Sequence, residues 1–169
     1  MVKDKLHLSS IFLAIIGLLD SLYLYWVKIT NAYALCGPIG DCESVNSSRF
    51  AEIAGIPIAL LGAGSYLTIL GLLLLERRRY FWAEYVPLMV FGLSLVGVMY
   101  SAYLTYVEVA ILKAICPYCV ISAIVLVILL ALATVRLLRI SIAQSADYAR
   151  NAPIPAARNF WLHWSRGVI

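Results

Sequence analysis

Four stretches of this chain are each apolar over about twenty residues, the length that crosses the hydrocarbon core of a bilayer as a helix. They are Leu8–Ile29, Ile56–Leu75, Tyr85–Val109 and Ile115–Leu138. Of the 169 residues, 63% are hydrophobic and 13% are charged, whereas soluble domains carry roughly 45–50% and about 25%. One water-soluble core of this size cannot hold that apolar excess. The sequence therefore predicts an all-α membrane protein, a bundle of four transmembrane helices.

Positively charged residues near the span ends indicate orientation, because they are enriched on the cytoplasmic side of a membrane. If the four helices alternate, Lys3, Lys5, Arg77, Arg78, Arg79, Arg136 and Arg139 share one side, and Lys28, Arg49 and Lys113 share the other. We therefore expect a multi-pass cell-membrane protein with both termini in the cytoplasm. The polar loop Thr30–Ala54 and the third connection are expected on the extracytoplasmic side, where Glu108 and Lys113 should be solvated.

The predicted domain boundary follows the fourth span. Residues 1–139 are expected to form the transmembrane domain and residues 140–169 a cytoplasmic tail. Pro153 and Pro155 argue against one continuous helix in the tail. Trp161, Trp164 and several arginines suit a segment that lies on the membrane surface, and a partly disordered tail is the alternative.

The four cysteines fall on one predicted membrane face, the extracytoplasmic one, which is usually oxidising. Cys36 and Cys42 surround a Gly/Pro turn in the first loop, and Cys116 and Cys119 open the fourth helix as Cys-Pro-Tyr-Cys. A helix N-terminus stabilises a thiolate, the species that attacks disulfides. Pro117 suits the first helical turn, where its missing N–H costs nothing. A mobile pair beside a fixed pair is what a thiol–disulfide relay requires.

Two other interpretations use the same residues. Both pairs could be structural disulfides of an exported loop, which is the commoner case for a membrane protein. A four-cysteine zinc site is also conceivable, although His7 and His163 both lie on the predicted cytoplasmic side and cannot contribute. Cysteine spacing alone leaves relay, structural disulfides and metal binding open, and we expect no metal.

Several motifs in order carry a resemblance to a known family. Ala34-Leu35-Cys36 opens the loop, and the run from Cys42 to Arg49 places Ser48 six residues after the second loop cysteine. Gly55-Ile56-Pro57 and Gly62 begin the second span, and the Cys116–Cys119 motif begins the fourth. Over roughly residues 18–140 the chain resembles the vitamin K epoxide reductase family, in its prokaryotic single-domain form without a fused thioredoxin-like domain.

The resemblance implies a quinone-dependent thiol oxidoreductase and a role for each cysteine. Cys36 would exchange electrons with a thioredoxin-fold, DsbA-like partner, supplied as a separate protein. Cys42 would shuttle by a transient disulfide with Cys116, and Cys119 would face a membrane quinone, menaquinone or ubiquinone. Ser48 would hold the loop over the quinone or bind it. The overall outcome would be disulfide bond formation outside the cytoplasm.

Two departures from the family pattern concern the quinone pocket. The vertebrate enzymes have an asparagine where Ile58 falls, and a tyrosine where Ala123 falls. Both losses argue against vitamin K epoxide as the substrate. A DsbB-like protein is an alternative enzyme of another family, but it has its Cys-x-x-Cys in the first outward loop, the reverse of the order here.

Asp20 is an acidic residue well inside the first span. Ionisable side chains inside a membrane are costly and often functional. Asp20 is therefore a candidate for a proton path to the quinone, with a hydrogen-bonded packing residue as the alternative.

Overall fold

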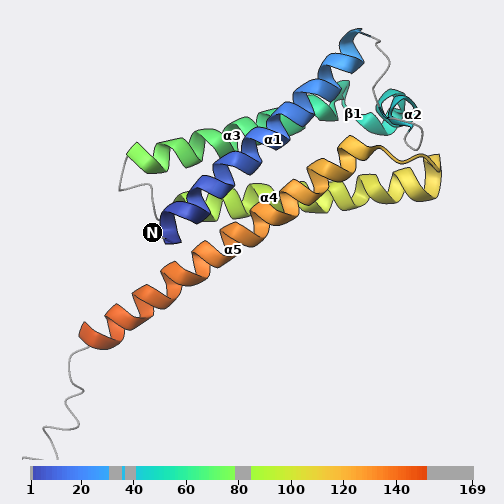
Figure 1. Ribbon diagram of the computed structural model, residues 1–169. Helices are drawn as coiled ribbons and strands as arrows, with labels where there is room; N and C mark the ends of the chain where they lie inside the picture. The colour runs from blue at the N-terminus through green and yellow to red at the C-terminus, as the bar shows by residue number, and fades with distance from the viewer. Residues whose placement is uncertain (1, 31–35, 37–40, 79–84, 152–169) are drawn as a thin grey trace, which may run out of the picture. The chain divides into compact units, whose positions relative to one another are not determined.

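The computed structural model describes residues 2–30, 36, 41–78 and 85–151, and its long elements are four α-helices (Figure 1). These are α1 (Val2–Thr30), α3 (Ile58–Arg78), α4 (Tyr85–Tyr106) and α5 (Pro117–Asn151). All four are long and apolar enough to cross a membrane. The predicted all-α, four-span architecture is thus confirmed, and the chain is a multi-pass membrane protein.

The chain divides into two compact units, residues 1–136 and residues 137–169. In the first unit each long helix contributes to one apolar core, for example through Ala14 of α1, Ile69 of α3, Val90 of α4 and Leu129 of α5. Many large apolar side chains on the same helices are exposed instead, among them Phe12, Leu19, Leu67, Val96 and Met99. Helices that are apolar on every side suit a lipid environment.

The helix ends differ from the predicted spans. Residues 56 and 57 are in a strand, so α3 begins at Ile58, directly after Pro57. After α4 the chain continues as a π-helical turn, η3 (Val107–Leu112), which ends at Lys113 in the left-handed conformation with φ 51°. In the second unit, residues 137–151 continue α5, so the first part of the predicted tail is helical. The rest of that tail, residues 152–169, lies outside the described residues.

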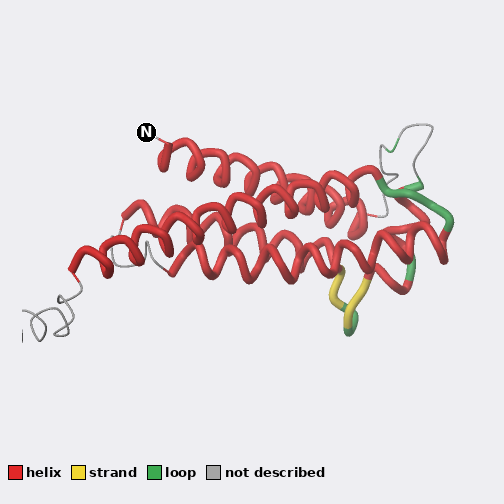
Figure 2. Tube along the Cα trace, turned by 90° about the horizontal axis from the view of Figure 1, so that it is seen from below, coloured by secondary structure: helices red, strands yellow, loops and turns green. Residues whose placement is uncertain are grey.

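The first loop contains local structure that the sequence analysis did not anticipate. It has a short helix α2 (Cys42–Ser47), a 3-10 turn η1 (Arg49–Ala51) and an antiparallel hairpin of β1 (Glu52–Ile53) and β2 (Ile56–Pro57). Both turn residues of the hairpin, Ala54 and Gly55, have positive φ angles of 52° and 82°, as a type I′ turn requires. Figures 1 and 2 place α2 and the hairpin at the end of the bundle where α5 begins.

Close packing between α1 and α3 depends on Gly17. A Cβ atom on Gly17 would lie 2.3 Å from ring atoms of Tyr66. The Tyr66 side chain is fully buried, and its hydroxyl lies 2.9 Å from Ser122 Oγ of α5. The ring therefore has little room to retreat, and the absence of a side chain at position 17 lets three helices meet.

We expect Gly17→Ala to destabilise the bundle by about 1–3 kcal/mol, the usual cost of an extra methyl group in a packed core. Gly64→Ala is the matched control, because it is also helical and a Cβ there meets no atom within 4 Å. Unfolding of both variants in detergent measures the difference. Equal stability of the two variants would show that Tyr66 moves aside without cost.

Candidate active site

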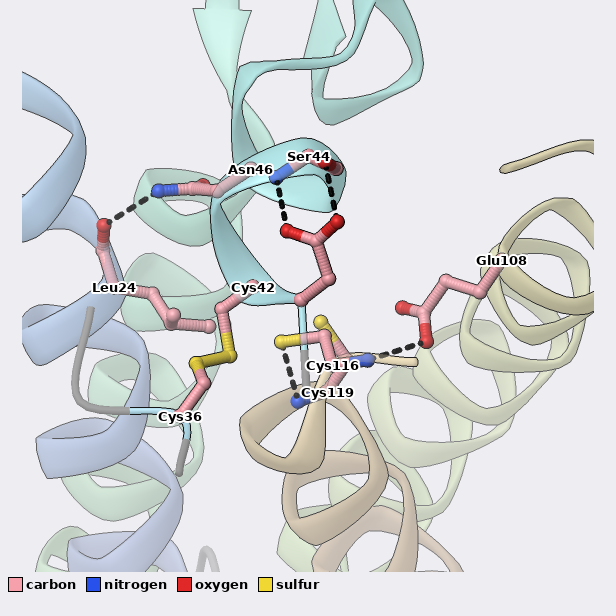
Figure 3. Close-up of a disulfide and its surroundings, with 9 residues drawn as sticks. Leu24, Cys36, Cys42, Ser44, Asn46, Glu108, Cys116 and Cys119 are labelled. Carbon is pink, nitrogen blue, oxygen red and sulfur yellow. Dashed lines mark hydrogen bonds between the residues drawn. A yellow bond between two sulfur atoms is a disulfide. The ribbon is translucent and has the colours of Figure 1, made fainter. Parts of the chain in front are cut away.

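The two cysteine pairs differ in redox state. Cys36 and Cys42 form a disulfide with Cα atoms 6.1 Å apart, and Cys116 and Cys119 are free thiols (Figure 3). The structure thus joins the two loop cysteines to each other and leaves the helix pair reduced.

Cys116 occupies the N-cap position of α5. Its carbonyl accepts the first helical hydrogen bond, from Val120 N at 3.1 Å. Its sulfur accepts the backbone N–H of Cys119, with N and Sγ 3.4 Å apart. A hydrogen bond from the Cys119 side chain lowers the pKa of the Cys116 thiol, burial opposes this effect, and the Cys119 backbone N–H lowers the pKa further. Cys116 is therefore the thiol in this motif that the helix end prepares as a nucleophile.

The loop is joined to the start of α5 by a backbone hydrogen bond. Asp41 N donates to Ile115 O at 3.2 Å, so the residues that follow them, Cys42 and Cys116, are brought to one place. Each of these two cysteines is 1% exposed, and both belong to one buried cluster. The cysteine predicted to shuttle and its predicted target are thus neighbours, sealed from solvent.

Side chains at both ends of α2 fix its conformation. The Asp41 carboxylate accepts the backbone N–H of Ser44 at 3.1 Å and the Ser44 hydroxyl at 2.6 Å. These two bonds lower the pKa of Asp41. At the other end, the Ser48 hydroxyl donates to Val45 O at 2.8 Å. Ser48 also lines the cavity described below, so the structure ties it to the loop and leaves it beside the cavity.

Two hydrogen bonds attach α2 to α1, and an ion pair attaches β1 to α1. Lys28 Nζ donates to Asn46 O at 2.7 Å and pairs with Glu52 of β1 at 3.1 Å. The Asn46 amide donates to Leu24 O at 3.3 Å. These bonds help to position Cys42 at the start of α2.

A cavity of about 350 Å³ adjoins the thiols within the first unit. Its wall is mostly apolar, with a few polar groups, and all four described long helices contribute to it. The predicted residues Asp20, Ser48, Cys116 and Cys119 line it, as does Ile58. The loop disulfide partner Cys36 is not among the lining residues. The volume is within the range of small-molecule sites.

Glu108 was expected to be solvated, and that prediction is wrong. Its side chain is buried, with the residue 3% exposed, and one carboxylate oxygen accepts the Cys116 N–H at 3.2 Å (Figure 3). Glu108 lies in the π-helical turn η3, where it and Val107 are buried, and the turn ends at Lys113 in the left-handed conformation. Nothing in the local sequence signals this, although π-helical turns are frequent at functional sites.

Tyr66 and Ser122 are further cavity residues that the sequence analysis did not assign. The Tyr66 hydroxyl lies 2.9 Å from Ser122 Oγ and donates to Ser122 O at 3.2 Å. A pair of hydroxyl groups from α3 and α5 thus lies on the cavity wall.

These features define a membrane thiol oxidoreductase site, with a loop disulfide, a dithiol at a helix N-terminus and a mostly apolar cavity close together. The sequence matches the model of the vitamin K epoxide reductase family over residues 8–134. The chain belongs to that family, and it is accordingly a quinone-dependent thiol oxidoreductase.

Proposed function

We propose that this enzyme oxidises a thioredoxin-fold, DsbA-like protein outside the cytoplasm and passes the electrons to a membrane quinone, menaquinone or ubiquinone. The observation that carries the proposal is the contact between the cysteine pairs, through the Asp41–Ile115 hydrogen bond, beside a cavity lined by Cys116 and Cys119. Energetically, strongly oxidising thioredoxin-fold proteins, near about −120 mV, need a still stronger acceptor.

The steps balance as disulfide exchanges. A partner thiolate attacks Cys36 and releases Cys42 as a thiolate. Cys42 then attacks Cys116 of an oxidised Cys116–Cys119 pair and frees Cys119. The partner's second thiol displaces Cys36 and closes the partner's own disulfide. Cys36 then attacks Cys42, which breaks the Cys42–Cys116 bond, re-forms the Cys36–Cys42 disulfide and releases Cys116 as a thiolate. The reduced helix pair gives two electrons and two protons to the quinone and closes its own disulfide.

Asp20 and Ser48 take supporting roles in this proposal. Asp20 Oδ2 is buried and has no hydrogen-bond partner among the described residues, and Asp20 lines the cavity. It is therefore proposed as part of a proton path. Ser48 is proposed to hold the loop over the quinone, because its hydroxyl ends α2 at the cavity wall.

The test is quinone reduction by the purified protein in detergent, with a reduced thioredoxin-fold protein as donor. We expect turnover by the wild type and background rates from each Cys→Ser variant, because each thiol has its own exchange step. Asp20→Asn, included in the same series, should slow quinone reduction. A wild type that is inactive with both quinones, while its variants stay folded, would favour structural disulfides instead.

A further inference from the structure

Glu108 has an unsatisfied carboxylate oxygen next to the dithiol. Oε2 accepts the Cys116 N–H at 3.2 Å, and Oε1 is buried with no hydrogen-bond partner among the described residues. Leaving a buried charged or polar group without a partner costs free energy. A buried carboxylate oxygen without a partner is therefore a candidate for a functional role. Glu108 also lines the cavity.

The surroundings of Glu108 are those of a proton-transfer site. Its carboxyl interacts electrostatically with the thiols of both Cys116 and Cys119. The other titratable groups that line the cavity are Asp20 of α1, Tyr66 of α3 and Tyr100 of α4. Asp41, ahead of α2, is exposed and binds Ser44. Of the cavity carboxyls, Glu108 is the one hydrogen-bonded to the Cys-x-x-Cys motif.

We propose that Glu108 is the acid–base residue that takes the proton of the Cys119 thiol and delivers it to a quinone oxygen. This inference rests on the proposed reduction of quinone by the helix dithiol. In that reaction the two thiols lose two electrons and two protons, an S–S bond forms, and the quinone becomes a hydroquinone. Glu108 gains a proton from sulfur and gives it to oxygen, so it ends in its starting state.

A merely structural role for Glu108 makes a different prediction. If its task were only to hold the Cys116 N–H, then glutamine, whose amide oxygen also accepts, would serve as well, and alanine would not. If its task is proton transfer, glutamine fails as alanine does. General acid–base groups contribute roughly 10²- to 10⁴-fold to a rate, so the two cases are far apart.

The experiment follows hydroquinone formation in a single turnover, starting from protein with a reduced helix pair and no partner present. We expect Glu108→Gln and Glu108→Ala to slow this step by roughly a hundredfold, with its pH dependence altered. Glu108→Asp should retain part of the rate. Asp147→Asn is the control, because that carboxylate is 69% exposed and its loss should leave the rate unchanged.

A second readout needs no quinone. Glu108 opposes the lowering of the Cys116 pKa that the Cys119 hydrogen bonds produce, so Glu108→Gln should let the thiolate form at lower pH, seen as its ultraviolet absorbance. More thiolate combined with slower quinone reduction would support proton transfer. A wild-type rate in Glu108→Gln would overturn the inference. If the wild type itself fails to reduce quinone, the proposed function fails instead.

Discussion

Cys36→Ser is expected to abolish turnover and to accumulate a disulfide between Cys42 and Cys116. In this variant Cys42 has lost its partner and is a free thiol, 1% exposed within the cluster that contains Cys116. When the helix pair is oxidised, Cys42 attacks Cys116 and frees Cys119. No Cys36 thiol then exists to attack Cys42 and complete the exchange, so the intermediate decays only by return attack of Cys119 on Cys116 and accumulates.

The geometry makes Cys116, and not Cys119, the expected target. The Asp41–Ile115 hydrogen bond aligns the residues just before Cys42 and Cys116. Cys119 lies one helical turn further on, and its backbone N–H is directed at the Cys116 sulfur. Attack at Cys116 also leaves Cys119 free on the cavity wall, where a quinone can reach it.

Peptide mass spectrometry under non-reducing conditions, after oxidation by quinone, identifies the crosslink. Cys36→Ser/Cys116→Ser is the control and should show no Cys42 crosslink to the helix. Alkylation of the variant should also reveal one free thiol, Cys119. A crosslink from Cys42 to Cys119, or a Cys42 that stays free, would contradict the proposed order of exchange.

The parts of this architecture that depend on composition could be predicted from the sequence. Span number follows from the length of apolar runs, and the relay hypothesis follows from cysteines that open a helix beside a loop pair. Glu108 could not be assigned, because its burial depends on a π-helical turn and a left-handed Lys113. The Asp41–Ile115 contact could not be predicted either, since it joins segments far apart in the chain.

The contacts of Arg136, at the other end of the bundle, could not be predicted from the sequence either. As a flanking positive charge it served to predict orientation, yet its side chain is only 7% exposed. Arg136 of α5 donates to Glu76 of α3, whose side chain is 8% exposed. His7 of α1 donates to Leu73 O at 2.9 Å and lies 3.7 Å from the second Glu76 oxygen. Three helices are therefore connected through one buried carboxylate.

Arg136→Met is expected to destabilise the protein by about 3–5 kcal/mol, because it leaves the Glu76 charge buried and uncompensated. The matched control is Arg139→Met on the same helix, where the arginine is exposed and the change should stay within about 0.5 kcal/mol. Denaturant unfolding in detergent measures both variants.

The double variant Glu76→Leu/Arg136→Met separates the pair's net contribution from the cost of breaking it. Replacing a buried ion pair with apolar side chains is often neutral or stabilising, so the double variant should regain most of the stability that Arg136→Met loses. The coupling free energy then comes from the double-mutant cycle. If the double variant is as unstable as Arg136→Met, the loss arises from the arginine's own packing. In that case the buried charge of Glu76 is not what links α1, α3 and α5.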